Sequence, residues 1–236
     1  MRVRPLELKK MKFLKQVSLI SVLLCSQTMH SATTAIGQVV NAPNYNITYA
    51  TTNPSKVDGL YACKGLFEGN SSISPLPEGY PEIEEIGNTT QENSLIKAVS
   101  CLDKVGGVCL ADDVGFGFPA FNGWPGIFAH REEYRFRSPY DYKKFIANGI
   151  ARNGTNSMDM TISAALCDKN TCVVKTKIVP GFFNSSAITN ASGFWDVFVP
   201  KTAEKENARC SAVRGALRLF KLDTVGSDTE SNHTEL

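Results

Sequence analysis

The sequence predicts a mainly β protein, α+β at most: an antiparallel sandwich or partial barrel with one or two short helices, stabilised by disulfides. Three observations favour this class: strand-like runs in the second half, turn-forming residues between them, and six cysteines after residue 35. With 236 residues and 42% hydrophobic composition, the chain suits one domain. We divide it into a signal peptide (1–35), a single exported β-rich domain (36–222) and a disordered polar tail (223–236).

Elements are expected in the following order. A polar stretch at 33–52 is an edge strand or loose arm, and the Pro/Gly-rich segment 69–90 is a long surface loop. Apolar spacing predicts a short helix over 91–104, and Ser138 followed by Pro139 predicts a second helix over 138–146. Alternating residues predict a hairpin of strands 158–166 and 172–179, and further strands at 193–199 and 212–222.

The first 35 residues carry the parts of a secretory signal. A basic stretch, starting at Met1 or Met11, precedes an apolar run at 17–25, and small residues follow. This run is far shorter than the roughly 20 residues that span a bilayer. The sequence therefore predicts a secreted or extracytoplasmic protein, with the bacterial periplasm as an alternative and no membrane span in the mature chain.

The chain ends in His233-Thr234-Glu235-Leu236. These four residues resemble variants of the Lys-Asp-Glu-Leu retrieval signal, an ending known among luminal carboxylesterases. The resemblance implies only a localisation signal and no activity, so the endoplasmic reticulum lumen is a further alternative localisation.

The six cysteines of the mature segment are expected to form three disulfides, since their number is even in an exported chain. Zinc knuckles need closer cysteine spacing with histidines, so we expect no metal site. The hairpin pairs Cys167 with Cys172, and the Gly106-Gly107 turn after the first helix pairs Cys101 with Cys109. The remaining pair is Cys63 with Cys210.

Seven Asn-x-Ser/Thr sequons follow the signal, more than composition alone predicts, and they indicate a glycoprotein. They are Asn46, Asn70, Asn88, Asn153, Asn184, Asn190 and Asn232.

Lysine and arginine total 25 against 23 aspartates and glutamates, and six of the basic residues precede the apolar run. No basic block remains downstream, which excludes nucleic-acid binding.

His130 is the weak candidate for a catalytic base, because the only other histidine after the signal lies in the tail. The alternatives are a structural histidine or a metal pair with Glu133, for which no third ligand is found. Acidic residues suited to hydrolysis are present but define no site. They are Asp112, Asp113, Glu132, Glu133 and Asp141. No phosphate loop or dinucleotide fingerprint occurs, so no cofactor is expected.

Ten of the aromatic residues lie between Phe116 and Phe145, together with three arginines. In one interpretation they fill the core and residues 134–137 form a half-buried strand; in the other, the loop 122–126 is exposed and binds a ligand. The candidate binding residues are Trp124, Tyr134, Arg135 and Arg137.

We therefore predict a disulfide-bonded, exported binding domain for a protein or glycan partner. The alternatives are a small secreted hydrolase using His130 or a carboxylate pair, and a coat component; no oligomeric state is assigned.

Overall fold

The computed structural model describes residues 45–230, except 62, 64–65, 67–71 and 204–206. The predicted signal peptide, the sequons Asn70 and Asn232 and the last six residues lie outside this part of the chain. Among the described residues, no helix is long and apolar enough to cross a membrane.

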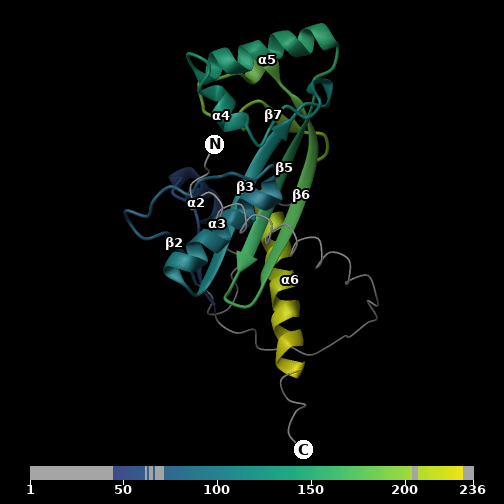
Figure 1. The fold of residues 1–236 in the computed structure, drawn as a ribbon. Helices are drawn as coiled ribbons and strands as arrows, with labels where there is room; N and C mark the ends of the chain where they lie inside the picture. The colour runs from purple at the N-terminus through teal and green to yellow at the C-terminus, as the bar shows by residue number, and fades with distance from the viewer. Residues whose placement is uncertain (1–44, 62, 64–65, 67–71, 204–206, 231–236) are drawn as a thin grey trace, which may run out of the picture. The chain divides into compact units, whose positions relative to one another are not determined.

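The described chain forms a mixed sheet flanked by helices (Figure 1). The strand order is β2-β1-β3-β5-β6-β7, and β4 pairs with β3 outside this path. Strand β1 is parallel to both β2 and β3, whereas all other pairs are antiparallel. The strands are β1 (Asn46–Tyr49), β2 (Ser72–Pro75), β3 (Val108–Gly117), β4 (Pro125–Gly126), β5 (Ser157–Cys167), β6 (Cys172–Phe183) and β7 (Phe198–Pro200).

Five α-helices occur in the described residues: α2 (Pro54–Tyr61), α3 (Thr90–Val105), α4 (Ala129–Glu133), α5 (Pro139–Asn153) and α6 (Ala208–Glu230). Two short 3₁₀ helices, η2 (Pro119–Phe121) and η3 (Ser185–Ala187), complete the fold. The Thr89 side chain accepts a hydrogen bond from the Glu92 amide and caps α3. Ser138 caps α5 in the same way, with proline in its first turn.

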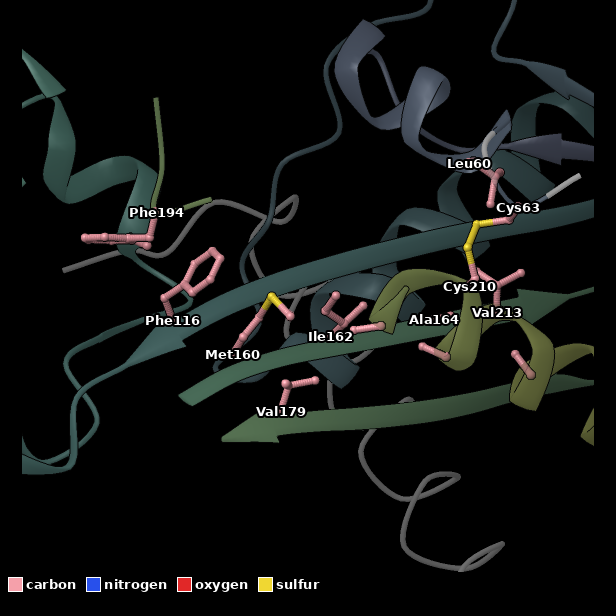
Figure 2. Packing of buried hydrophobic residues seen from close by; sticks show 14 of the residues in the cluster. Leu60, Cys63, Phe116, Met160, Ile162, Ala164, Val179, Phe194, Cys210 and Val213 are labelled. Carbon is pink, nitrogen blue, oxygen red and sulfur yellow. A yellow bond between two sulfur atoms is a disulfide. The ribbon is translucent and has the colours of Figure 1, made fainter. Parts of the chain in front are cut away.

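The sheet separates two hydrophobic clusters because successive side chains of a strand point to opposite faces. Met160, Ile162 and Ala164 of β5 pack with Val213 and other residues of α6 on one face (Figure 2). Ala165 and Cys167 pack on the other face with residues of α3. Long strands β3, β5 and β6 therefore form the centre of an α/β layered structure.

The predicted antiparallel sandwich or barrel with one or two helices is therefore wrong. Segment 212–222 is part of α6, since Ala212, Val213, Ala216 and Phe220 are buried at helical spacing. The helix also runs into the predicted disordered tail, as far as Glu230. Within 193–199 only the last two residues are strand, and 134–137 form turns after α4.

The predicted hairpin and the two predicted helices are confirmed. The hairpin forms as β5 and β6, with Cys167 directly opposite Cys172. Both predicted helices form, as α3 and α5. The arm at 33–52 contains β1, which is an internal strand rather than an edge, and the loop at 69–90 contains the short strand β2.

Three disulfides are present, and they are the pairs expected from the sequence. They join Cys63 to Cys210, Cys101 to Cys109 and Cys167 to Cys172. The first links the segment that follows α2 to the first turn of α6, whereas the other two close short local loops.

Candidate active site

Two adjacent carboxylates, Asp112 and Asp113, are buried in β3, with exposed fractions of 2% and 6%. Strand alternation sends them to opposite faces of the sheet. Asp113 lies on the face covered by α3, and Asp112 lies on the face where α2 and α6 meet. A charge in a buried strand is unfavourable without partners, so each carboxylate requires its own set of cations or donors.

Asp112 is bound by groups from three elements. The Tyr49 hydroxyl of β1 donates to Oδ1, and Nε of Arg209 in α6 donates to Oδ2 at 3.2 Å. Nζ of Lys56 in α2 lies 3.7 Å from Oδ1 and donates to the Asp112 carbonyl oxygen at 3.3 Å. The carboxylate therefore ties β1, α2 and α6 to the central strand.

Asp113 is bound by α3. Nζ of Lys97 donates to Oδ1 at 3.0 Å, and the amide of Asn93 donates to Oδ2 at 3.2 Å. Lys97 also donates to Glu85 at 2.6 Å, so one ammonium group bridges two carboxylates. Arg131 holds the Glu85 loop by donating to its carbonyl oxygen at 2.6 Å.

The loop before α3 is fixed by close backbone packing. The Gly87 amide donates to Asn93 Oδ1 at 2.8 Å. A Cβ at Gly87 would lie only 2.7 Å from that oxygen, so a larger residue would push the loop away from the helix. The contact orients the Asn93 side chain, whose amide nitrogen is then directed at Asp113.

The two carboxylates have pKa values shifted in opposite directions. Burial alone would raise the pKa of Asp112, but Lys56 and Arg209 outweigh it and hold the pKa well below its usual value. Burial raises the pKa of Asp113, and the ion pair with Lys97 offsets this only in part. Asp112 thus stays charged to lower pH than an ordinary aspartate, whereas Asp113 is the more basic carboxylate.

The cations respond to the same surroundings. Burial lowers the pKa of Lys56, and the attraction of Asp112 offsets this only in part. For Lys97, burial is outweighed by Asp113 and Glu85, which raise its pKa. Lys97 therefore remains charged between its two carboxylates.

A cavity of about 430 Å³ lies along the Asp113 face, next to the first turn of α3. Its wall includes Gly115 and Gly117, which follow Asp113 at alternate positions of β3, and Asp159 and Thr161 of the neighbouring strand β5. A Cβ at Gly117 would lie 2.9 Å from the Gly123 carbonyl oxygen, so glycine is needed for the loop to approach the strand. The volume is that of a small-molecule site.

The candidate catalytic residues from the sequence do not converge. His130 lies on α4, where its Nε2 is 3.0 Å from the exposed Tyr134 hydroxyl. Glu133 accepts hydrogen bonds from Ser192 and the Gly193 amide and serves to fix that loop. Neither contacts Asp112 or Asp113 in the described structure, so the structure does not bring His130 and the carboxylates together in one site.

The candidate binding residues do not share one surface. Tyr134 is 75% exposed, and Arg135 forms a surface ion pair with Glu132 at 3.2 Å. Arg137 is exposed in the turn after α4. Trp124 is instead partly buried, with edge contacts to the rings of Phe121, Tyr142 and Phe145, and packs against the main hydrophobic cluster. Their role in binding stays a prediction.

Trp124→Ala is expected to lower the free energy of unfolding by about 2–3 kcal/mol, because it removes an indole from a packed aromatic cluster. The matched control is Tyr134→Ala, which removes an exposed ring and is expected to cost less than about 0.5 kcal/mol. Urea denaturation measures both. Equal midpoints for the two variants would show that Trp124 contributes no packing energy.

Sequence reasoning named both aspartates but missed Tyr49, Lys56, Glu85, Lys97 and Arg209. One signal was available: Asp112-Asp113 directly follows the apolar run 108–111 in a segment that reads as a buried strand. Two charged residues in a buried strand need partners of opposite charge, but which residues supply them depends on contacts between segments distant in sequence.

The described residues contain no group of three or more histidine, cysteine or acidic side chains suited to a metal ion. Glu85 and Asp113 are nevertheless two carboxylates held by one lysine. Mg²⁺ commonly uses one or two carboxylates together with substrate phosphates. These two residues could therefore bind a divalent cation that is also bound by phosphates.

Comparison with known proteins identifies the fold and its relatives. A sequence model described as Ham1 family matches residues 47–215. A dITP/XTP pyrophosphatase of Nautilia profundicola is 29% identical over 167 residues, covering 67% of this chain and 83% of that protein. Another, from Thermoanaerobacter pseudethanolicus, is 41% identical over 88 residues, which cover 36% of this chain and 43% of the relative's length.

Solved structures show the same architecture. A HAM1 protein from Coxiella burnetii superposes with a TM-score of 0.58 at 24% identity, covering 78% of this chain and 99% of that one. The Staphylococcus aureus Ham1 protein gives a TM-score of 0.59 at 18% identity, covering 77% and 99%. These likenesses establish the fold, a mixed curled sheet with helices.

The comparisons overturn the interpretation of the chain as an exported binding domain. The relatives are named as nucleotide pyrophosphatases, and nothing in the matches indicates a signal, secretion or glycosylation. The predicted secreted, periplasmic or luminal localisation is therefore wrong, as is the alternative of a small secreted hydrolase based on His130 or a carboxylate pair. An apolar run after basic residues and an even cysteine count are features of composition, and neither is specific to export.

Proposed function

Because the chain belongs to the Ham1 family, we propose that it is a nucleoside-triphosphate pyrophosphatase acting on substrates such as dITP or XTP. The observation that carries the proposal is the buried pair Asp112-Asp113, whose carboxylates form ion pairs with Lys56, Lys97 and Arg209. The pair lies within the segment matched by the family model. On the Asp113 face, Gly115 and Gly117 of the same strand line a cavity large enough for part of a nucleotide.

The charges of the site suit a polyphosphate. The cations are divided between the two faces of the sheet. Lys56 and Arg209 exceed Asp112 by one positive charge. On the other face, Lys97 and Arg131 balance Glu85 and Asp113. Fixed cations in a site shielded from water stabilise the negative charge that develops on phosphate oxygens. Lys97 and Arg131, which meet at Glu85, are placed to do so on the Asp113 face.

Asp113 is the best candidate for the general base. Neighbouring carboxylates with pKa values shifted in opposite directions have distinct roles in acid–base catalysis. In the proposed reaction Asp113 takes a proton from water, and the water oxygen attacks the α-phosphorus. The bond from that phosphorus to the bridging oxygen breaks, and pyrophosphate leaves with the nucleoside monophosphate as the other product.

The proposal is tested by incubating the purified full chain with Mg²⁺ and single nucleotides. Pyrophosphate and inorganic phosphate are measured separately, with dITP and XTP compared against dATP and dGTP. We expect pyrophosphate as the product and a higher kcat/KM for dITP and XTP. Release of inorganic phosphate alone, or no turnover of any nucleotide, would contradict the proposed function.

Asp113→Asn is expected to lower kcat by about 10²–10⁴-fold with little change in KM, because it removes the base but keeps the shape of the side chain. Since burial raises the pKa of Asp113, activity of the parent should fall as pH drops through a value above 3.8. The matched control is Asp103→Asn on the exposed side of α3. An Asp113→Asn enzyme with parental kcat would rule out this residue as the base.

A further inference from the structure

The Cys63–Cys210 disulfide joins the two segments that supply cations to Asp112 (Figure 2). Cys63 follows α2, whose first turn carries Lys56. Cys210 is in the first turn of α6, directly after Arg209. The other two disulfides lie elsewhere: one connects α3 to β3 and the other closes the β5–β6 hairpin.

Arg209 is packed tightly against α2. A Cβ at Gly59 would overlap with the Arg209 guanidinium, so a larger residue at position 59 would displace the guanidinium from its place on α2. The guanidinium also lies over the Trp195 ring at 5.7 Å. Lys56 and Arg209 approach Asp112 at different carboxylate oxygens. The spacing between α2 and α6 therefore determines whether both cations reach the aspartate.

Helix α2 has little else to hold it in place. It has eight residues, and Leu60 is its only buried one. A helix this short is not stable by itself in water, because too few hydrogen bonds follow the costly first turn. Its position depends on Leu60, on partly buried Val57, on the ion pair at Asp112 and on the covalent link that follows it.

We propose that the Cys63–Cys210 disulfide is a positioning element of the active site, which fixes α2 against α6 so that Lys56 and Arg209 bind Asp112 together. The inference rests on the proposed function. Reduction by a dithiol would release this constraint. One thiolate of the reagent attacks a sulfur of the bridge, and its second thiol resolves the mixed disulfide. The protein gains two thiols, and the reagent becomes a cyclic disulfide.

The first test compares the parent with Cys63→Ala/Cys210→Ala, using Cys167→Ala/Cys172→Ala as the matched control. Measurements are made at a temperature where circular dichroism shows each variant to be folded. We expect KM for dITP to rise at least five-fold in the first variant with kcat within two-fold, because loosening Lys56 weakens phosphate binding in ground and transition states alike. The control should keep the parental KM. An unchanged KM in the first variant would overturn the proposal.

Gly59→Ala tests the same geometry with the disulfide intact. The added methyl displaces the Arg209 guanidinium, so KM is measured at a temperature where circular dichroism shows the variant to be folded. We expect the same direction of change, a several-fold rise in KM. A parental KM in this variant would show that the seating of Arg209 on α2 has no role in substrate binding.

Two readouts separate this inference from the proposed function. Hydrogen exchange of the α2 amides should be at least ten-fold faster in Cys63→Ala/Cys210→Ala than in the parent, whether or not any nucleotide is hydrolysed. Binding of inorganic tripolyphosphate, measured by calorimetry, should weaken in parallel. If the parent turns over no nucleotide but both changes appear, the proposed function fails and the positioning role stands. Equal exchange and equal tripolyphosphate affinity would overturn the positioning role.

Discussion

Asp112→Asn is expected to lower the free energy of unfolding by about 3–5 kcal/mol, because it leaves buried Arg209 and partly buried Lys56 without their counter-ion. Arg209 Nε and Lys56 Nζ lie 3.2 and 3.7 Å from the carboxylate oxygens, and the aspartate side chain is fully buried. The Tyr49 hydroxyl also loses an ionised acceptor. The cost should appear as a lower urea midpoint at an unchanged slope.

Asp103→Asn provides the control for this measurement, since it removes an exposed carboxylate and should change the free energy of unfolding by less than about 0.5 kcal/mol. The KM of Asp112→Asn for dITP should also rise several-fold, because Lys56 is displaced. A destabilisation below about 1 kcal/mol would mean that Lys56 and Arg209 find water or other partners, and that Asp112 does not organise the site.

The same ion cluster sets a pH dependence with a defined sign. The pKa of Asp112 is lowered in the folded protein, so the folded state holds this proton less tightly than the unfolded state. Its stabilising contribution is therefore complete above the ordinary value of 3.8 and is lost as pH falls further. In Asp112→Asn this part of the acid sensitivity should disappear.

Segments whose structure depends on near neighbours were predictable from the sequence. The β5–β6 hairpin follows from strict alternation around Met160 and Ile162 and from the turn after Cys167. Helix α3 follows from the apolar spacing along 91–104, although its cap is Thr89, and α5 follows from the capping Ser138 and Pro139. In each case the decisive interactions span only a few residues of chain.

Segment 212–222 shows why other elements were missed. Val213, Leu217 and Leu219 are compatible with a strand, whereas Ala212, Val213, Ala216 and Phe220 fit one face of a helix. The structure buries the second set against β5 and β6. A short apolar run of mixed spacing does not distinguish a strand from a helix. The surface that this segment packs on is formed by strands that are distant in sequence.

The active site could not be predicted from local sequence patterns for the same reason, because its residues are distant from one another in the chain. Lys56, Asp112 and Arg209 are brought together only by the parallel pairing of β1 with β3 and by the packing of α6. Parallel pairs need a crossover, and here the crossover from β1 to β3 contains α2, β2 and α3. It also supplies Lys56, Glu85 and Lys97, which the sequence shows only as ordinary charged residues in a helix or loop.

Loss of the Cys63–Cys210 bridge is expected to have the largest effect on stability among the three disulfides. It closes a loop of 147 residues in sequence separation, against 8 and 5 for the other two. The chain-entropy relation then gives about 5 kcal/mol for Cys63–Cys210 and about 2 kcal/mol for Cys167–Cys172, before any strain is subtracted. Alanine replaces cysteine in both pairs, because Cys63 and Cys210 are buried beside Leu60 and Val213, where a serine hydroxyl would add a separate cost.

The measurement is urea denaturation of Cys63→Ala/Cys210→Ala and Cys167→Ala/Cys172→Ala without reductant, followed by circular dichroism. We expect the first variant to unfold at a much lower urea concentration and the second to lose less than half as much free energy. Adding a dithiol to the parent should reproduce at least the larger loss, because all three bridges are then open. If the hairpin variant proved the less stable of the two, native packing at the β5–β6 turn, rather than the entropy of the unfolded chain, would determine what each disulfide contributes.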